Sequence, residues 1–303
     1  MTAPTPFTCI DRRTDRPRQD AIYAPRFLHW CHNTWFGRAL TDFVFSLGIF
    51  SRLYGWFNRQ SWSRRKIHGF CDTMGVDLDE LCQPLDEFRS FNDLITREID
   101  LSQRPIDADP RVCAAPADGR FLVYSRIRVD EPFPIKRLSF DLRTFLRDDR
   151  LIADYDNGSM AVGRLYLADY HHFHFPAAGV ARTVRVIPGK YYAVSPYSQR
   201  WPVPVFAENR RMVTMLDTVQ FGPIAMVEVG AFTVGSIRQC FTVGKSVGKG
   251  EHKGYFELGA SVVVLLFRPG AIVFDTDLKK NTAAGMETFL RIGESIGRCV
   301  TDA

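Results

Sequence analysis

Residues 262–267, with the sequence VVVLLF, constrain the fold of this chain more than any other stretch. This run of β-branched and large apolar residues is far shorter than the ~20 residues that a membrane-spanning helix needs, and it is typical of a buried β-strand. Small residues, Gly259, Ala260 and Ser261, stand directly before it. A serine at the mouth of such a strand is usually a turn residue, but it can also be a placed nucleophile. The chain therefore needs a sheet that buries this strand, and the role of Ser261 stays open at this point.

The two parts of the chain differ in their apolar pattern. Residues 24–90 carry aromatic and aliphatic side chains at spacings of three and four, which predicts helices. After residue 104, short apolar runs alternate with Gly, Pro, Asp and Asn, and stretches such as ARTVRVI (181–187) alternate with period two. This pattern predicts a mainly antiparallel β domain, and the lack of a βαβ rhythm or a G-x-G-x-x-G motif argues against a nucleotide-binding fold.

We therefore expect an α+β fold, in which N-terminal helices are followed by a mainly antiparallel β core. The expected organisation is a polar tail at 1–20, a helical region at 21–100 and a β-rich core at 101–303. No stretch is long and apolar enough to span a membrane, and the first twenty residues lack the apolar centre of a signal peptide. Any contact with a membrane is therefore expected at its surface.

Positive charge is concentrated near the N-terminus. Residues 11–70 contain eleven Lys and Arg against four Asp, whereas the rest of the chain is close to neutral. Such asymmetry favours an anionic partner, either nucleic acid or lipid head groups. The basic residues lie among tryptophans and phenylalanines, and no nucleic-acid-binding motif appears, so we expect no nucleic-acid partner. The aromatic helices either cover the sheet or lie in a membrane interface, and one helix can do both.

Three places in the sequence carry residues with catalytic chemistry. Asp118 stands in PADGRF, where Asp-Gly commonly forms a turn. The segment DYHHFHFP contains His171, His172 and His174, which are open to a structural role, a metal site or a general base with a pKa near neutral. No obvious set of further ligands completes a metal site, and the seven scattered cysteines form no C-x-x-C pair, so no metal is expected.

Ser261 needs a base and an orienting group to become a nucleophile. Asp118, one of the histidines and Ser261 would form such a set, although only the fold can bring them together. No G-x-S-x-G motif surrounds Ser261, which argues against an ordinary α/β-hydrolase.

The chain resembles the phosphatidylserine decarboxylases, a family of self-processing, pyruvoyl-dependent enzymes, over nearly its whole length. The N-terminal segments NTWFGRAL, FSRLYGWF and FNDLITREIDLSQRPID are similar to the helical part of the family. The motifs PADGRF, DYHHFHFP, VEVGAFTVGSI, KGEHKGYFELGASVVVLLF and NTAAGMETFLRIGESIG follow in the order of its core motifs. Each motif is weak by itself, and five in register make the resemblance specific.

The resemblance implies a role for each matched residue. Ser261 matches the serine that becomes the pyruvoyl group, and His174 matches the base of self-cleavage. Asp118 matches the aspartate that orients this base, and His171 matches the histidine of the decarboxylation step. The implied cofactor is a covalent pyruvoyl group derived from Ser261, with cleavage between Ala260 and Ser261.

The chain departs from the family pattern around the cleavage point. The family has Gly-Ser-Thr or Gly-Gly-Ser-Thr, where this chain has Gly-Ala260-Ser261-Val262. In addition, His172 replaces a usual arginine and His252 a usual glutamate. A second register would place Ala260 on the serine and leave no pyruvoyl precursor. The spacing to the end of the apolar strand favours Ser261.

The implied chemistry explains the small residues before the strand. The Ser261 hydroxyl attacks the carbonyl carbon of Ala260, and an ester replaces the amide. β-Elimination and hydrolysis then leave a pyruvoyl group at the new N-terminus. Its ketone binds the amine of the serine head group and accepts electrons while carbon dioxide leaves, so that phosphatidylserine becomes phosphatidylethanolamine.

The resemblance also implies partners and a location. These are phosphatidylserine in an anionic membrane, a heterodimer of the cleaved chains 1–260 and 261–303, and a homodimer of such heterodimers. The protein is then peripheral on the cytoplasmic face of the cell membrane. Two alternatives remain: a non-cleaving, membrane-binding homologue without decarboxylase activity, supported by Ala260 and Val262, and a pyruvoyl decarboxylase acting on a soluble amino acid.

Overall fold

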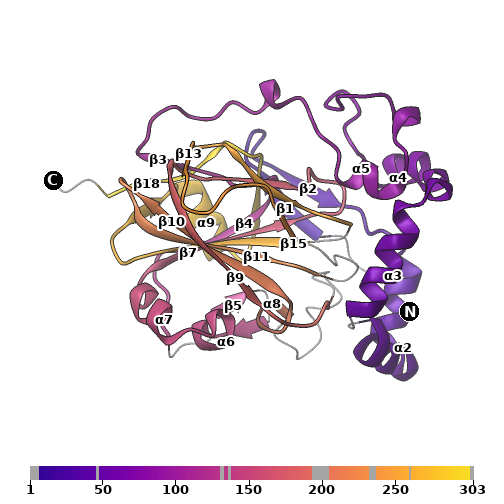
Figure 1. Ribbon diagram of the computed structural model, residues 1–303, viewed down its shortest axis with the longest axis horizontal. Helices are drawn as coiled ribbons and strands as arrows, with labels where there is room; N and C mark the ends of the chain where they lie inside the picture. Colours follow the sequence, from indigo (N-terminus) through magenta and orange to yellow (C-terminus); the bar gives the residue numbers. More distant parts are fainter. Residues whose placement is uncertain are drawn as a thin grey trace.

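The structure of the chain is a computed structural model. It describes residues 7–45, 48–129, 133–135, 138–192, 205–231, 237–258 and 261–300. The fold is α+β, with a helical region at one end of a large and mainly antiparallel sheet, so the predicted fold class is confirmed (Figure 1).

A ten-stranded sheet forms the centre of the molecule, in the order β13-β9-β10-β11-β15-β7-β4-β17-β1-β2. Every pair of neighbouring strands in it is antiparallel except β1 and β17, which are parallel. Its strands are β1 (Phe7–Asp11), β2 (Arg16–Asp20), β4 (Gly119–Tyr124), β7 (Ser159–Leu165), β9 (Gly179–Ile187), β10 (Arg211–Thr218), β11 (Gly222–Val229), β13 (Ser246–Val247), β15 (Ser261–Phe267) and β17 (Glu287–Leu290).

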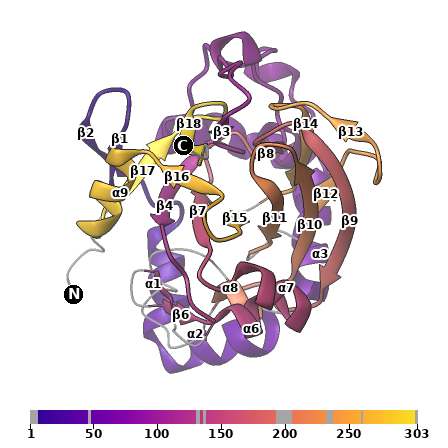
Figure 2. The same ribbon diagram turned by 90° about the vertical axis from the view of Figure 1, so that its left-hand side faces the viewer.

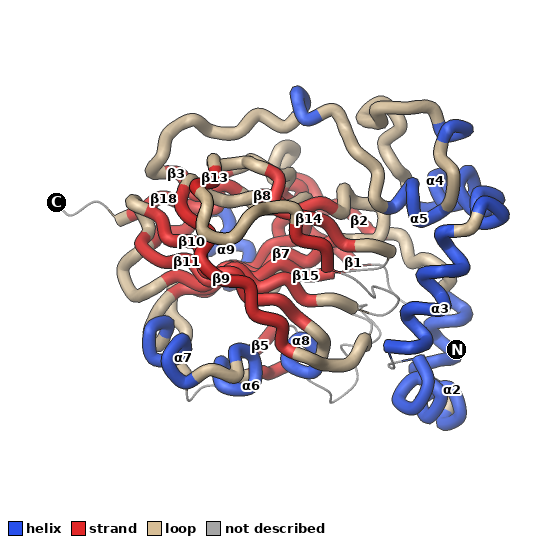
Figure 3. Tube along the Cα trace, in the orientation of Figure 1, coloured by secondary structure: helices blue, strands red, loops and turns tan. Residues whose placement is uncertain are grey.

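Among the described residues, three small sheets accompany the large one, and Figure 3 shows how the strands gather in the body of the molecule. Their orders are β12-β14-β8, β16-β18-β3 and β5-β6. The strands are β3 (Val112–Ala114), β5 (Phe133–Ile135), β6 (Leu138–Phe140), β8 (His172–His174), β12 (Ile237–Gln239), β14 (His252–Phe256), β16 (Ile272–Phe274) and β18 (Ser295–Cys299).

Strand β15 lies in the interior of the large sheet, between β11 and β7. All seven of its residues are buried. The side chains at 263, 265 and 267 join a core cluster that includes residues of β8, β14 and β3, whereas those at 262, 264 and 266 join a cluster on the opposite face. Burial on both faces explains why this strand is a continuous apolar run rather than an alternating one. The prediction of a buried strand is therefore confirmed.

Helices cover the face of the large sheet on which residues 262, 264 and 266 lie. The helices α6 (Leu142–Leu146), α7 (Asp149–Tyr155) and α8 (Val205–Glu208) pack there, and Figure 2 shows them together below the sheet. Near the edge strands, α9 (Thr276–Ala283) packs against β4 and β17.

The N-terminal helices form a separate layer at one end of the sheet (Figure 1). They are α1 (Pro25–Asn33), α2 (Trp35–Leu40), a π-helical turn (Thr41–Phe45), α3 (Gly48–Arg59), a 3₁₀ segment (Ser61–Lys66), α4 (Ile67–Met74) and α5 (Phe91–Ile95), with shorter 3₁₀ turns at Leu85–Glu87 and Leu101–Gln103. The helices predicted over residues 24–90 are confirmed. No helix within the described part of the chain is long and apolar enough to cross a membrane.

The expectation for the first residues is wrong in one respect, because strands precede the helices. Residues 7–20, assigned from the sequence to a polar tail, form the hairpin β1–β2 at the edge of the large sheet. Pro17 and the arginines of β2 are tolerated because an edge strand has one side that needs no hydrogen-bond partner. The carboxylate of Asp20, at the end of β2, is buried against Arg120 at 2.7 Å and ties the hairpin to the core.

Candidate active site

Ser261 is the first residue of β15 and is fully buried. Its backbone pairs with Leu165, the last residue of β7. Because side chains alternate along a strand, Ser261 points to the same face as Val263, the face on which β8 and β14 pack. Its hydroxyl oxygen has no hydrogen-bond partner among the described residues. A buried hydroxyl without a partner costs about 1–3 kcal/mol and marks a site where a functional explanation is needed.

The residue on the other side of the predicted scissile bond, Ala260, lies outside the described residues, as does Gly259. The assignment of cleavage to the Ala260–Ser261 bond therefore stays a prediction. The described chain ends at Leu258, a buried residue that packs in the core of the helical region, and resumes at Ser261.

His174 lies on β8 with a defined tautomer. Its Nδ1 is 2.9 Å from the carbonyl oxygen of Gly250, and its Nε2 is 3.3 Å from the hydroxyl oxygen of Tyr170. A carbonyl only accepts, so Nδ1–H donates to Gly250 and Nε2 keeps the lone pair of a neutral imidazole. Burial lowers the pKa of His174 to about 4, against a smaller opposing effect of the Gly250 carbonyl. The ring is therefore neutral at pH 7 and can accept a proton at Nε2, although its pKa is well below the near-neutral value expected from the sequence.

His171 precedes β8 and is fully buried. Its Nε2–H donates to the Leu167 carbonyl at 3.2 Å, and its Nδ1 has no partner among the described residues. Burial, reinforced by the positive charge of Arg97, lowers its pKa to about 3. Leu165 pairs with Ser261, and the Leu167 carbonyl accepts a hydrogen bond from His171. The two unpartnered atoms, Oγ of Ser261 and Nδ1 of His171, therefore belong to residues that both adjoin the short segment 165–167.

Asp118 lies in the turn between β3 and β4, and its carboxylate is held by two donors. One oxygen accepts from Arg104 at 3.1 Å and the other from the backbone N–H of Ile292 at 2.8 Å. Asp118 lies near enough to His174 to raise the pKa of its ring slightly against the effect of burial. Among the described residues, however, no hydrogen bond joins any two of Asp118, His174 and Ser261.

His172 and His252 form a pair that sequence reasoning did not connect. Nε2–H of His172 donates to the Thr96 carbonyl at 3.1 Å, and the Nδ1 of His172 lies 2.9 Å from the Nε2 of His252. The Tyr170 ring stacks on His172 with centroids 4.7 Å apart. Burial lowers the pKa of His172 to about 4. The sequence signal for this pair is that positions 172 and 252 both depart from the family pattern. A pair of neutral imidazoles takes the place of the arginine and the glutamate that the resemblance implies.

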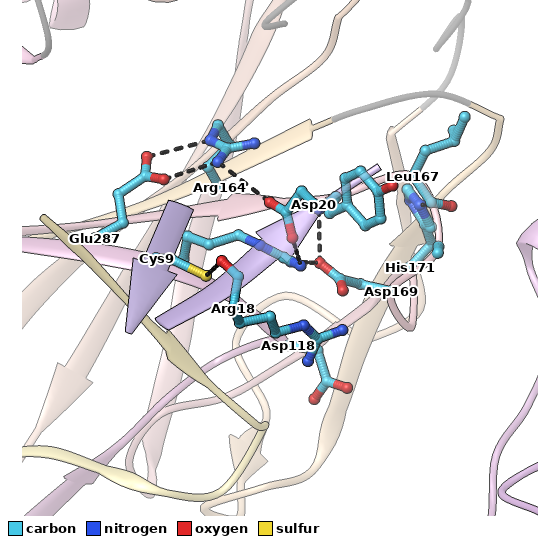
Figure 4. Close-up of polar contacts among 12 residues, drawn as sticks. Cys9, Arg18, Asp20, Asp118, Arg164, Leu167, Asp169, His171 and Glu287 are labelled. Atoms are coloured by element: carbon cyan, nitrogen blue, oxygen red, sulfur yellow. Dashed lines mark hydrogen bonds and ion pairs between the residues drawn. The ribbon is translucent and has the colours of Figure 1, made fainter. Parts of the chain in front are cut away.

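A network of buried ion pairs supports the wall of this site (Figure 4). Glu287 binds Arg164 at 2.7 Å, Arg164 lies 3.8 Å from Asp20, and Arg120 bridges Asp20 and Asp169. Burial raises the pKa of Asp169 to about 6, although Arg120 opposes this effect. Asp169 stands in the segment between Leu165 and His171 that adjoins Ser261, so the network fixes this segment to the hairpin β1–β2.

A polar pocket of about 170 Å³ lies next to these residues. Asp118 and Tyr170 line it, together with four arginines: Arg18, Arg97, Arg104 and Arg291. Sequence reasoning missed the arginines and Tyr170, because nothing in the sequence tells a buried arginine from an exposed one. No group of three or more potential metal ligands occurs in the part of the chain that the structure describes.

Comparison with known proteins places the chain in a family. Residues 91–298 match the family model described as phosphatidylserine decarboxylase. A protein of Chlamydia muridarum named phosphatidylserine decarboxylase proenzyme is 39% identical over 292 residues, which cover 96% of this chain and 97% of the relative. The proteins of the same name from Chlamydia pneumoniae and Chlamydia caviae are 40% and 38% identical, over 95% and 97% of this chain and over 96% and 98% of their own lengths. The chain therefore belongs to the phosphatidylserine decarboxylase family.

Proposed function

We propose that this chain is a proenzyme that cleaves itself between Ala260 and Ser261 and then decarboxylates phosphatidylserine to phosphatidylethanolamine. The observation that carries the proposal is the Ser261 hydroxyl, which is buried and unpartnered at the start of the central strand of a chain in this family. The alternative of a non-cleaving homologue is not favoured, since the relatives with almost the same length are named proenzymes.

The proposed cofactor is a pyruvoyl group formed from Ser261, and the site fits such a group. The Ser261 side chain is small and fully buried, and its oxygen is not used in the fold. The strand that follows is buried on both faces, so a new N-terminus at 261 stays anchored in the core. When bound, the group supplies a ketone that reacts with the amine of the substrate and acts as an electron sink.

We assign the general base of self-cleavage to His174. Attack of the Ser261 oxygen on the carbonyl carbon of Ala260 releases the hydroxyl proton, and a neutral imidazole whose Nε2 keeps its lone pair, beside the Tyr170 hydroxyl, can take it. The bond from Nδ1–H to Gly250 fixes the tautomer that this role needs. The negative charge of Asp118 stabilises the imidazolium once it has formed, which is an electrostatic role because Asp118 is hydrogen-bonded elsewhere.

We assign the decarboxylation step to His171. Its unpartnered Nδ1 adjoins the segment that pairs with Ser261, and burial keeps its ring neutral. A cationic ring beside the departing carboxylate would stabilise the charged ground state and slow the loss of carbon dioxide. A neutral ring avoids this penalty and still presents a nitrogen that can exchange a proton with the substrate.

The N-terminal helices are the proposed membrane-binding region of a peripheral protein on the cytoplasmic face of the cell membrane. They expose large apolar side chains, among them Trp35 at 82% and Phe43 at 76%. The basic residues Arg64 and Arg65 are exposed on the following 3₁₀ segment. Exposed aromatic rings beside basic residues are typical of helices that lie in an anionic membrane interface. The other interpretation, complete packing of these rings against the sheet, does not fit their exposure.

Lys66 differs from its two basic neighbours. Its ammonium group donates to Asn58 at 2.9 Å and lies over the rings of Tyr54, Phe57 and Phe91. Lys66 therefore stabilises the helical region, and its replacement would test the fold rather than membrane binding.

The proposed organisation follows from these assignments. Residues 21–100 form the membrane-associating region, and residues 101–303 form the catalytic core, with the hairpin β1–β2 added to its edge. After cleavage, chains 1–260 and 261–303 stay together as a heterodimer, because β15 pairs with β11 and β7 of the longer chain. We also propose that two such heterodimers associate.

The experiment that tests this function measures phosphatidylethanolamine formed from phosphatidylserine vesicles by the purified protein. Borohydride or hydroxylamine, which react with ketones, should abolish turnover. The Ser261→Ala chain is the matched control and should be uncleaved and inactive. Turnover by the Ser261→Ala chain, or turnover that resists both reagents, would contradict the proposal.

A further inference from the structure

Arg97 is a buried cation without an ion-pair partner among the described residues. It follows α5 and is 6% exposed. Its Nη1 donates to the Leu94 carbonyl at 3.3 Å and its Nη2 to the Ala168 carbonyl at 2.6 Å, whereas its buried Nε has no acceptor. A guanidinium carries five N–H donors, so most of the donors of Arg97 are unused. Burying a charge in this way is costly unless an anion joins it.

Other buried arginines in the described part of the chain either form an ion pair or donate from every nitrogen, although the Nε atoms of Arg104 and Arg120 also lack an acceptor. Arg104, Arg120 and Arg164 each form ion pairs with buried carboxylates. Arg211 has no ion pair in the described part of the chain, but all three of its nitrogens donate to backbone carbonyls, at distances of 2.6 and 2.7 Å. Arg97 has neither arrangement, and packing alone does not account for it.

Arg97 is one of the residues that line the polar pocket described above. The buried acids of that pocket are engaged elsewhere, because Glu80 and Asp118 bind Arg104 and Asp169 binds Arg120. Arg291 is likewise paired, with Glu80 at 3.0 Å. Arg97 is therefore a buried positive charge of the pocket that forms no ion pair with a described carboxylate, which suits a ligand with a negative charge.

Arg97 also stands next to the residues assigned to the reaction. Its Nη2 binds Ala168, in the segment between Leu165, which pairs with Ser261, and His171. The positive charge of Arg97 contributes to the lowered pKa of His171, which places the two side chains within electrostatic reach. An anion bound by Arg97 would therefore lie beside the proposed reaction centre.

We propose that Arg97 binds the phosphodiester of the lipid head group. This inference rests on the proposed function and adds a substrate-binding residue to it. The head group carries two anions, a carboxylate and a phosphodiester. A guanidinium on the carboxylate would stabilise the charge that decarboxylation must remove, whereas the phosphodiester keeps its charge throughout the reaction. Planar N–H donors suit phosphate oxygens, and the pocket is large enough for a head group but not for acyl chains.

The test measures binding of glycerophosphoethanolamine, a soluble phosphodiester that has neither a carboxylate nor acyl chains. Calorimetry is performed on the processed protein and on the uncleaved Ser261→Ala chain, each with and without Arg97→Gln. Loss of charged hydrogen bonds should weaken binding about 10- to 100-fold. Arg18→Gln is the matched control: it removes the same charge from the pocket, but Arg18 is half-buried and already lies 3.9 Å from the Asp11 carboxylate, so it should change binding less than about threefold. Equal effects of the two substitutions would overturn the assignment.

Turnover on phosphatidylserine vesicles gives a second readout. Arg97→Gln should raise KM more than it lowers kcat, because the phosphodiester has the same charge in the ground state and the transition state. Binding that depends on Arg97 in a chain without turnover would leave the inference standing and remove the proposed function. If the chain instead turns over phosphatidylserine but binds glycerophosphoethanolamine equally well with and without Arg97→Gln, the proposed function stands and the inference about Arg97 is overturned. Weaker binding of serine alone, with unchanged binding of glycerophosphoethanolamine, would assign Arg97 to the carboxylate and overturn the proposal.

Arg97→Gln removes a buried side chain, so a measurement on the unmodified chain is also needed. A crystal structure of the processed wild-type protein with glycerophosphoethanolamine should place a phosphate oxygen within hydrogen-bond distance of Nε or a free Nη–H of Arg97. A phosphate bound elsewhere in the pocket would refute the proposal whatever the stability of the variant.

Discussion

The buried histidines of the site should make the protein lose stability between pH 7 and pH 5. His172 and His174 each have a folded-state pKa of about 4, whereas an imidazole in the unfolded chain has a pKa near its ordinary 6.5. Both states are neutral at pH 7. As the pH falls through 6.5, the unfolded chain binds protons that the folded chain rejects, and unfolding becomes more favourable. The stability contribution is therefore complete above pH 6.5 and lost as the pH falls toward 4.

The linkage relation gives the size of this effect. For one histidine with these two pKa values, the free energy of unfolding falls by about 2 kcal/mol between pH 7 and pH 5. The perturbation is His172→Gln, which removes one titrating group and keeps a polar side chain near the Thr96 carbonyl. The variant should therefore lose about 2 kcal/mol less than the parent over this range, whatever its absolute stability.

Urea unfolding at pH 7, 6 and 5 measures this difference. The Ser261→Ala background keeps the chain intact, so that unfolding and dissociation of cleaved chains are not mixed. Two curves of unfolding free energy against pH that run parallel would refute the reasoning, because they would show that His172 titrates alike in both states.

Three further predictions follow from the site and the helical region. His174→Ala should abolish cleavage, whereas His171→Ala should still be cleaved but fail to decarboxylate; gel analysis with a product assay separates the two, and normal cleavage and turnover in both variants would show that the roles are wrong. Ala260→Gly should speed cleavage, because glycine relaxes the backbone at the scissile bond; an equal or slower rate in a time course would show that the site is adapted to alanine. Replacing Trp35 and Trp56 by serine should reduce the salt-resistant part of binding to anionic vesicles without lowering the melting temperature, since both rings are exposed; unchanged binding by a folded variant would exclude these rings from the membrane contact.

The sequence predicts the core of this fold well and its edge poorly. The runs RMVTMLDT and SVVVLLF coincide with β10 and β15, because strands in the interior of the sheet turn apolar side chains toward its buried faces. The hairpin β1–β2 escapes prediction because its strands are short, charged and interrupted by Pro17. Its partner β17 lies at the other end of the chain, and local patterns do not report such a distant pairing.

The candidate site divides in a similar way. The motifs around Ser261, His171, His174 and Asp118 make these residues candidates in the sequence. The structure adds the tautomers of the two histidines and the hydrogen-bond partners of His171, His174 and Asp118. The expected near-neutral pKa of the base is replaced by a value of about 4 for His174, because the degree of burial is a property of the fold. Arg97 is an ordinary arginine in the sequence, and only the absence of a carboxylate beside it among the described residues singles it out.

The central claim is that Ser261 turns into a pyruvoyl group, and the intact mass of the purified chain tests it most directly. Mass spectrometry under denaturing conditions should give two fragments, residues 1–260 with a free carboxyl terminus and residues 261–303 with a ketone in place of the N-terminal amine of serine. Borohydride should add two hydrogens to the shorter fragment alone. A single mass for residues 1–303 in a preparation that forms phosphatidylethanolamine would contradict the account.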